Sequence, residues 1–192
     1  MDVLEAIFTR RTIPPVKMGP PGPDEAQIRH ILEAGCAAPD HGMLRPWRFL
    51  VVQGEGRRKL GDLFADSVRR NAPDASPEEI DKQRTAPLRA PMILVVAARL
   101  QPHHPKIPTV EQVAAVAAAA QNMLLAAHSL GFAAKWATGK QAYDAAVKTG
   151  LGLGGDDQII GFVYLGSLVA RHEAPSRPGL NDVVAQWPPA GS

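Results

Sequence analysis

Apolar residues recur at helical spacing in some segments of the chain and in unbroken runs in others. Helical spacing begins with the apolar stripe of Val3, Leu4, Ile7 and Phe8. This spacing predicts helices over residues 2–8, 24–36, 60–68, 109–130 and 143–149. Unbroken apolar runs predict strands over residues 47–52, 92–97, 133–137 and 159–165. Helices and strands therefore alternate, with no internal repeat.

Polar residues mark where several of these helices begin and end. Asp24 is placed as an N-cap, and the sequences at residues 76–79 and 109–112 have the form of capping boxes. Gly131 is placed to end the long helix. Alanines dominate residues 114–127 of that helix, which indicates close packing against another backbone, inside the domain or across a dimer.

Proline interrupts regular structure in two places. Residues 14–23 contain five prolines and two glycines, which predicts an extended segment crossing the surface. The tail after Arg171 is also rich in proline. Composition leaves two interpretations of this tail equally open, a segment that wraps a partner subunit and a loose end. The only cysteine, Cys36, has apolar neighbours and is expected to be buried in a helix.

Length and charge narrow the class of protein. The 192 residues fit one domain, residues 1–192, and 21 basic against 19 acidic residues argue against binding to nucleic acid. Residues 113–130 are apolar enough to suggest a membrane span, but Gln121, Asn122 and His128 favour a buried helix. The first residues include Asp2 and Glu5 and lack the apolar core of a signal peptide. We therefore expect a cytoplasmic protein without a membrane segment.

Motifs for common cofactors and metals do not occur in the sequence. There is no phosphate loop, no Gly-x-Gly-x-x-Gly fingerprint and no cysteine pair for zinc. The glycine-rich residues 150–155 are expected to form a loop before the last strand. His103 and His104 lie between prolines in a polar connection and are expected to be solvated, so no metal site is predicted.

Three clusters could carry chemistry. Arg10, Arg11 and Thr12 follow the first helix and could bind a terminal phosphate, although arginines there also simply offset the helix dipole. Residues 37–49 form a proline-bounded loop that could present His41 and Arg45 to a flat ligand, or could be a structural entry to a strand. Residues 131–139 place backbone donors and small side chains near Trp136, as a plain helix-to-strand connection would also do.

In this order the clusters resemble the nitroreductase family. The family pattern opens with Arg-x-Ser/Thr, matched by residues 10–12, and continues with Ala-Pro-Ser-x-x-Asn-x-Gln-Pro-Trp-x-Phe, matched by residues 38–49. It ends with a Trp-bearing segment, residues 131–136, and a Gly-x-x-x-x-Gly strand, residues 161–166. The resemblance covers residues 1 to about 171. It is closest to the short proteins that carry the name NAD(P)H nitroreductase, whose loop also reads Ala-Pro-Asp-His.

The resemblance implies an α+β fold, with a central mixed or antiparallel sheet flanked by helices, and an intertwined homodimer. It implies FMN at two interface sites, NAD(P)H as reductant and a small nitroaromatic or quinone as acceptor. Flavin N5 carries the hydride, so no catalytic side chain is expected. The cofactor-binding residues that the resemblance implies are Arg10, Arg11, Thr12 and Arg171 toward the phosphate, Ala37 and His41 from the partner chain, and Trp136, Ala137 and Thr138 on the other side.

The sequence departs from the family pattern at three positions. Met43 replaces the usual Asn, Arg45 the usual Gln, and Pro14 stands where many relatives have a lysine facing the flavin. A cation there would stabilise reduced flavin, and we hypothesise that Arg45 or His41 supplies it. Two alternatives remain: an enzyme of this fold with flavin-consuming or dehalogenating chemistry, and a non-catalytic dimer that binds or sequesters FMN.

Overall fold

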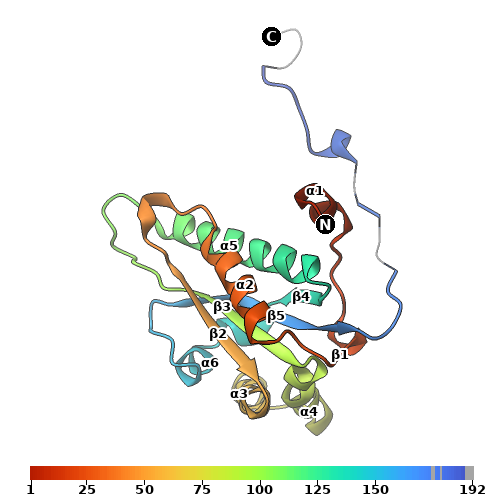
Figure 1. The fold of residues 1–192 in the computed structure, drawn as a ribbon. Coiled ribbons are helices and arrows are strands. Elements are labelled where there is room, and N and C mark those ends of the chain that lie inside the picture. The colour runs from red at the N-terminus through yellow and green to blue at the C-terminus, as the bar shows by residue number, and fades with distance from the viewer. Residues whose placement is uncertain (174–175, 178, 189–192) are drawn as a thin grey trace.

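Helices and strands alternate along the chain of the computed structural model, which describes residues 1–173, 176–177 and 179–188 (Figure 1). The α-helices are α1 (Val3–Thr9), α2 (Glu25–Cys36), α3 (Glu55–Asn71), α4 (Pro77–Thr85), α5 (Thr109–Ser129) and α6 (Ala145–Gly150). The strands are β1 (Met18–Gly19), β2 (Trp47–Gln53), β3 (Met92–Ala98), β4 (Ala133–Ala137) and β5 (Gln158–Leu168). Short 3-10 turns are η1 (Pro15–Lys17), η2 (His41–Met43), η3 (Ala86–Arg89), η4 (Lys140–Tyr143) and η5 (Leu180–Asp182).

The five strands form one antiparallel sheet in the order β1-β5-β3-β2, and β4 also pairs with β5. The long β5 is its centre, because β5 pairs with β3 from Gln158 to Leu165 and with β4 from Phe162 to Gly166. Within the described residues, the one parallel contact is an isolated bridge between Thr12 and Ala134. The predicted α+β class, with a sheet flanked by helices, is confirmed.

Each face of the sheet carries its own helical layer. One buried cluster joins α3 and α6 to the sheet through Leu60, Phe64, Val147 and Phe162. The other joins α2 and α5 to the opposite face through Ile31, Val116, Met123 and Leu165. Figure 1 shows α5 and α2 on one side of the strands and α3, α4 and α6 on the other. The sheet therefore separates the layer of α2 and α5 from the layer of α3 and α6.

Within the described residues, α5 is the one helix long and apolar enough to cross a membrane. Its residues Val116, Ala120, Met123 and Ala127 are buried against the sheet and α2. This packing confirms that the alanine-rich segment is a core helix, and the alanines allow the close approach that the sequence indicated.

The capping predictions divide into two groups. Asp24 and Ser76 form complete capping boxes with Gln27 and Glu79, as predicted. The box at residues 109–112 was wrong, because Pro108 is the N-cap of α5 and Thr109 is already helical. The amide of Gln112 instead bonds the backbone of Gln101 and Ile107, where it ties the preceding loop to the helix.

One prediction of burial also differs from the structure, and one predicted apolar stripe is left uncovered. Cys36 ends α2 and is exposed, because its position lies off the Ile31 face of the helix. The stripe on α1 exists, but Val3, Leu4 and Phe8 are exposed and only Ala6 is buried. In Figure 1, α1 stands beside the end of α5, and the tail runs past it away from the sheet. The apolar stripe of α1 therefore remains uncovered in the single chain.

Candidate functional site

Cationic side chains gather where α1 ends. The Arg11 guanidinium donates to the carbonyls of Phe8 and Arg10, at 2.6 and 3.0 Å. Arg177 of the tail donates to the carbonyls of Ile7 and Arg10, at 3.0 and 2.9 Å. His128, in the last turn of α5, shares a hydrogen bond of 2.8 Å with the Thr9 hydroxyl. Three arginines and a histidine thus meet at one helix end, which we call the cationic cluster: Arg10, Arg11, Arg177 and His128.

The electrostatics of this cluster are unfavourable without an anion. Partial burial lowers the pKa of Arg10, and the charges of Arg177 and Arg11 lower it further. Burial likewise lowers the pKa of His128, with Arg10 and Arg11 adding to the effect against Glu5. Within the described residues, no salt bridge to a carboxylate involves any member of the cluster. A ligand phosphate would supply the missing negative charge.

Strand β4 connects this cluster to a cavity. Thr12 bridges Ala134, and the backbone N–H of Ile13 donates to the Ala134 carbonyl at 3.1 Å. From Ala134 the strand runs to Ala137 and Thr138, which lie on the cavity wall. Three to four extended residues span about 10–13 Å. The cationic cluster and the cavity are therefore held at a fixed separation by one strand.

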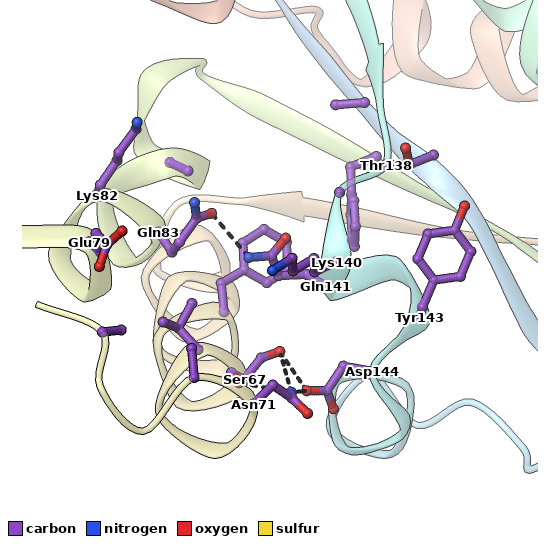
Figure 2. A pocket seen from close by; sticks show the side chains of 18 of the residues that line it. Ser67, Asn71, Glu79, Lys82, Gln83, Thr138, Lys140, Gln141, Tyr143 and Asp144 are labelled. Atoms are coloured by element: carbon purple, nitrogen blue, oxygen red, sulfur yellow. Dashed lines mark hydrogen bonds between the residues drawn. The ribbon is translucent and has the colours of Figure 1, made fainter.

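The cavity has a volume of about 1190 Å³ and lies between α3, α4 and the β4–η4 connection (Figure 2). The side chains of Gln83 and Gln141 join α4 to η4 across it through a hydrogen bond of 3.1 Å. The Asp144 carboxylate accepts from Ser67 and Asn71 of α3, at 2.5 and 2.7 Å. These three bonds tie the walls together, so the cavity is a preformed feature of the fold.

Trp136 faces the other way from its neighbours on β4. Its indole packs on the α5 side of the sheet, and its Nε1 donates to the Ile160 carbonyl at 3.0 Å. The ring also lies directly over Gly161, where any side chain would collide with it. Ala137 and Thr138 line the cavity, whereas Trp136 supports the sheet beneath it.

The loop with Ala37, His41 and Arg45 lies on the α5 face of the sheet. Three of the four residues from 42 to 45 have positive φ, namely Gly42, Met43 and Arg45, which is unusual for the two that are not glycine. Asp40 holds this conformation by accepting from the Arg45 backbone N–H, and Glu111 of α5 accepts from His41 Nδ1, both at 2.5 Å. The side chains of His41 and Arg45 are exposed. The loop is therefore fixed in shape while its cations face outward.

The predicted His41 and the predicted arginines lie at opposite ends of α5. Glu111, beside His41, and His128, beside the arginines, are 17 residues apart, which is about 26 Å along the helix. The sheet also stands between the loop and the cavity. One chain thus brings together Arg10, Arg11, Thr12, Ala137 and Thr138, but it does not bring Ala37, His41 and Arg45 to them.

The predicted phosphate ligand Arg171 forms a salt bridge of 3.1 Å with Glu173, and both side chains are exposed. Its carbonyl accepts from Lys17 at 2.7 Å, which fixes the start of the tail. Sequence reasoning missed Arg177 and His128 in the cationic cluster, and Gln83, Gln141 and Tyr164 on the cavity wall. No short motif surrounds any of them, so only the fold assembles them with the predicted residues.

Comparison with known proteins identifies the family. The model of the Nitroreductase family matches residues 7–167. "Putative NAD(P)H nitroreductase YdjA" of Escherichia coli strain K12 is 36% identical over 87% of this chain and 88% of its own length. A Nitroreductase-like family protein from Bacillus cereus has the same fold, with a TM-score of 0.82 at 24% identity over 97% of this chain and 96% of that one. A "putative nitroreductase in complex with FMN" from Desulfovibrio desulfuricans superposes with a TM-score of 0.75 at 26% identity, over 98% of each chain. The chain belongs to the nitroreductase family.

Proposed function

We propose that this protein is an FMN-dependent oxidoreductase that uses NAD(P)H to reduce nitroaromatic or quinone-like acceptors. The name of the Escherichia coli relative, NAD(P)H nitroreductase, supports the reductant, and the FMN complex of the Desulfovibrio desulfuricans relative supports the cofactor. The proposal includes a single domain over residues 1–192 and a location in the cytoplasm. The core position of α5 supports a protein without a membrane segment.

One observation carries the proposal: the cationic cluster without a counter-charge is joined by β4 to a large cavity. Arg10, Arg11 and Thr12 would hold the phosphate, with Arg177 as a further donor. Ala137 and Thr138 would border the flavin ring at the cavity wall. A ribityl chain can bridge the separation that β4 sets between them.

Bound FMN would supply hydride chemistry at N5, and the protein would position two planar partners in turn. The side chains of the cluster and the cavity suit that task. The cluster fixes the charged end of the cofactor, the cavity wall orients a flat ring, and the buried sheet beneath excludes water from one side. No side chain has to act as nucleophile or general base.

Turnover assays test the proposal. Purified protein should oxidise NADH or NADPH in the presence of a quinone or nitro acceptor, and alternate between the two substrates in a ping-pong pattern. Bound flavin without turnover across a broad acceptor panel would favour the alternative of a non-catalytic FMN-binding dimer. Consumption of the flavin itself, or release of halide from a halogenated substrate, would favour the other enzymatic alternative.

We further propose a homodimer in which each site uses both chains. The loop residues Ala37, His41 and Arg45 lie on the wrong face of the sheet for their own cavity, so a second copy would supply them. Exposed apolar side chains on α1 and the tail offer the surface for it, including Phe8, Val184 and Trp187. Sedimentation at micromolar concentration should show a dimer that carries flavin absorbance. A monomer that still binds FMN would contradict the shared site.

Arg45 is the better candidate for the cation that stabilises reduced flavin. Glu111 offsets the charge of His41, whereas the Arg45 guanidinium forms no salt bridge within the described part of the chain. We expect Arg45→Gln to lower the flavin midpoint potential by about 30 mV, equal to about 1.4 kcal/mol for two electrons, while FMN stays bound. His41→Ala should shift the potential less.

Potentiometry on the holoprotein measures both shifts, with Arg58→Gln on the remote surface of α3 as the control. Unchanged potentials in Arg45→Gln and His41→Ala would mean that the stabilising charge lies elsewhere. Lys17 would then be the next cation to replace.

A further inference from the structure

The last turn of α5 places an imidazole beside the arginines that are proposed to hold the FMN phosphate. His128 shares a hydrogen bond of 2.8 Å with the hydroxyl of Thr9, the residue that directly precedes Arg10 and Arg11. Histidine is the side chain whose charge changes near neutral pH, whereas arginine keeps its charge. Whether an anion bound here meets a neutral or a charged imidazole therefore depends on pH.

Hydrogen bonds around Thr9 determine which nitrogen of His128 carries the proton of the neutral ring. The Thr9 hydroxyl has a single proton, and it donates that proton to the Glu5 carbonyl at 2.6 Å. The hydroxyl must then accept from His128, so Nε2 carries a hydrogen. Nδ1 is the nitrogen left to gain or lose a proton, and it makes no hydrogen bond within the described residues. The ring is only partly buried, so water can deliver the proton.

Without a ligand, the surroundings of His128 disfavour its charged form. Burial lowers its pKa below the ordinary 6.5, the charges of Arg10 and Arg11 lower it further, and Glu5 opposes them. Arg177, which donates to the Arg10 carbonyl, adds another positive charge to the cluster. The imidazole is therefore mostly neutral at about pH 7 in the free protein.

Other charged groups at this end of α5 do not reverse the balance. The sulfur of Met1 lies 3.9 Å from a hydroxyl in the last turn of α5, which brings the N-terminal ammonium to the same end of the helix. Asp2 caps the opposite end of α1 by accepting from the Glu5 N–H at 2.9 Å. Lys135 lies on the face of β4 opposite to Trp136 and α5. The arginines of the cluster and the terminal ammonium thus outnumber the carboxylates of Glu5 and Asp2.

A bound phosphate would reverse the field at the imidazole. A phosphate monoester carries close to two negative charges above its second pKa of about 6. Held by Arg10 and Arg11, it would attract a protonated His128 and raise the pKa of the ring above that in the free protein. A group whose pKa rises on binding takes up a proton as the ligand binds, in the pH range between the two values.

On the basis of the proposed function, in which the cationic cluster holds the FMN phosphate, we propose that His128 is a further phosphate partner and acts in its protonated form. Binding of FMN takes one proton from water onto Nδ1, and dissociation of FMN returns it. The affinity that His128 adds is fully present below its pKa in the free protein. It is lost as pH rises through its pKa in the complex.

Titration of apoprotein with FMN at several pH values tests the proposal. His128→Gln is the matched variant, because the glutamine amide keeps an N–H toward Thr9 but cannot take up a proton. We expect the parent to bind FMN about 3- to 10-fold more tightly than the variant at about pH 6, and equally at about pH 8.5. The ratio cancels the titration of the phosphate, which affects both proteins alike. A ratio that stays the same across this range would overturn the proposal.

Two controls limit the effect to this contact. His30→Gln, which removes an exposed histidine paired with Glu33 on α2, should keep the pH profile of the parent. Riboflavin has the ring and ribityl chain of FMN without the phosphate, so its affinity ratio between parent and His128→Gln should not change with pH. A pH-dependent ratio with riboflavin would contradict a role of His128 toward the phosphate.

Calorimetry on the parent protein measures the proton uptake without the variant. Binding heats of FMN at about pH 7.5, in two buffers with different ionisation enthalpies, give the number of protons exchanged per FMN. The phosphate is almost fully ionised at this pH, so the uptake should come from the protein. We expect net uptake of a fraction of one proton; no uptake, or a net release, would contradict the proposal.

Sulfate as a probe distinguishes a failure of this proposal from a failure of the proposed function. It stays doubly charged over this pH range, so nuclear magnetic resonance of the His128 ring reports the effect of an anion alone. Sulfate should raise the titration midpoint of His128 above that in chloride of equal ionic strength, and leave His30 unchanged. This result in a protein that binds no FMN would support the anion role and count against the proposed function. An unchanged midpoint, or FMN binding with a ratio independent of pH, would count against His128 alone.

Discussion

Replacing Arg10 with alanine should weaken FMN binding by about 10- to 100-fold, because a charge-assisted contact to phosphate contributes about 1.5–3 kcal/mol. The Arg10 guanidinium makes no hydrogen bond or salt bridge within the described residues. It is repelled by Arg177 and Arg11, which lower its pKa after the effect of burial. We therefore expect Arg10 to contribute little to the stability of the apoprotein and much to the binding of an anion.

Because Arg10 is expected to affect FMN binding but not the stability of the apoprotein, the experiment has two readouts. Titration of apoprotein with FMN should show the loss of affinity, while thermal unfolding of the same apoprotein should show no loss of stability. Arg58→Ala, which removes an exposed arginine paired with Glu55, is the matched control for a change of charge. An unchanged FMN dissociation constant in Arg10→Ala would mean that Arg10 is only a charge at the end of a helix and does not bind the cofactor.

Replacing Asp144 with alanine should destabilise the fold by about 2–4 kcal/mol. Its carboxylate caps α6 through the backbone N–H groups of Ala146 and Val147, at 2.7 and 3.1 Å. It also accepts from Ser67 and Asn71 of α3. The substitution removes a helix cap and leaves the buried Ser67 hydroxyl without its acceptor, and these losses add. Chemical denaturation measures the change, with the exposed Asp156→Ala as control.

The pH dependence of stability checks the same carboxylate. Burial alone would raise the pKa of Asp144, but the hydrogen bonds from Ser67, Val147, Ala146 and Asn71 outweigh burial and lower it from 3.8 to about 2. The folded protein therefore holds the charged form more tightly than the unfolded chain does. This contribution, about 2 kcal/mol, is fully present above the unfolded pKa and is lost as pH falls from 3.8 toward 2. Between pH 3.8 and 2, Asp144→Ala should therefore lose less stability than the parent protein. An equal loss in the two proteins would mean that other groups cause the acid sensitivity.

Local patterns in the sequence were sufficient for most of the framework. The strand over residues 133–137 and the capped starts at Asp24 and Ser76 depend on residues close together, and the structure has them as predicted. The predicted capping box at Thr109 was wrong because it depended on contacts outside the motif. The Gln112 side chain bonds the loop before the helix and not the backbone of Thr109. The exposed stripe of α1 shows the same limit, since spacing predicts a face but not what covers it.

Only those residues of the candidate site that belong to a recognisable motif could be predicted from the sequence. Arg10, Arg11, Thr12, Ala137 and Thr138 follow the family pattern, and the fold places them along one strand. Arg177 comes from a tail whose composition gives no signal, and Tyr164 is one of many apolar positions in β5. The side of the sheet that Trp136 faces depends on the register of β4 against β5, which no sequence pattern indicated.

The absorption spectrum of the purified protein, followed by anaerobic addition of NADH and then NADPH, tests directly whether this chain is a flavin-dependent reductase. We expect the visible bands of bound flavin, close to one FMN per chain, and bleaching of those bands by at least one of the two reductants. Re-admission of a quinone should restore the bands. A protein that stays colourless after incubation with FMN, or one whose bound flavin neither nucleotide reduces, would contradict the proposed function.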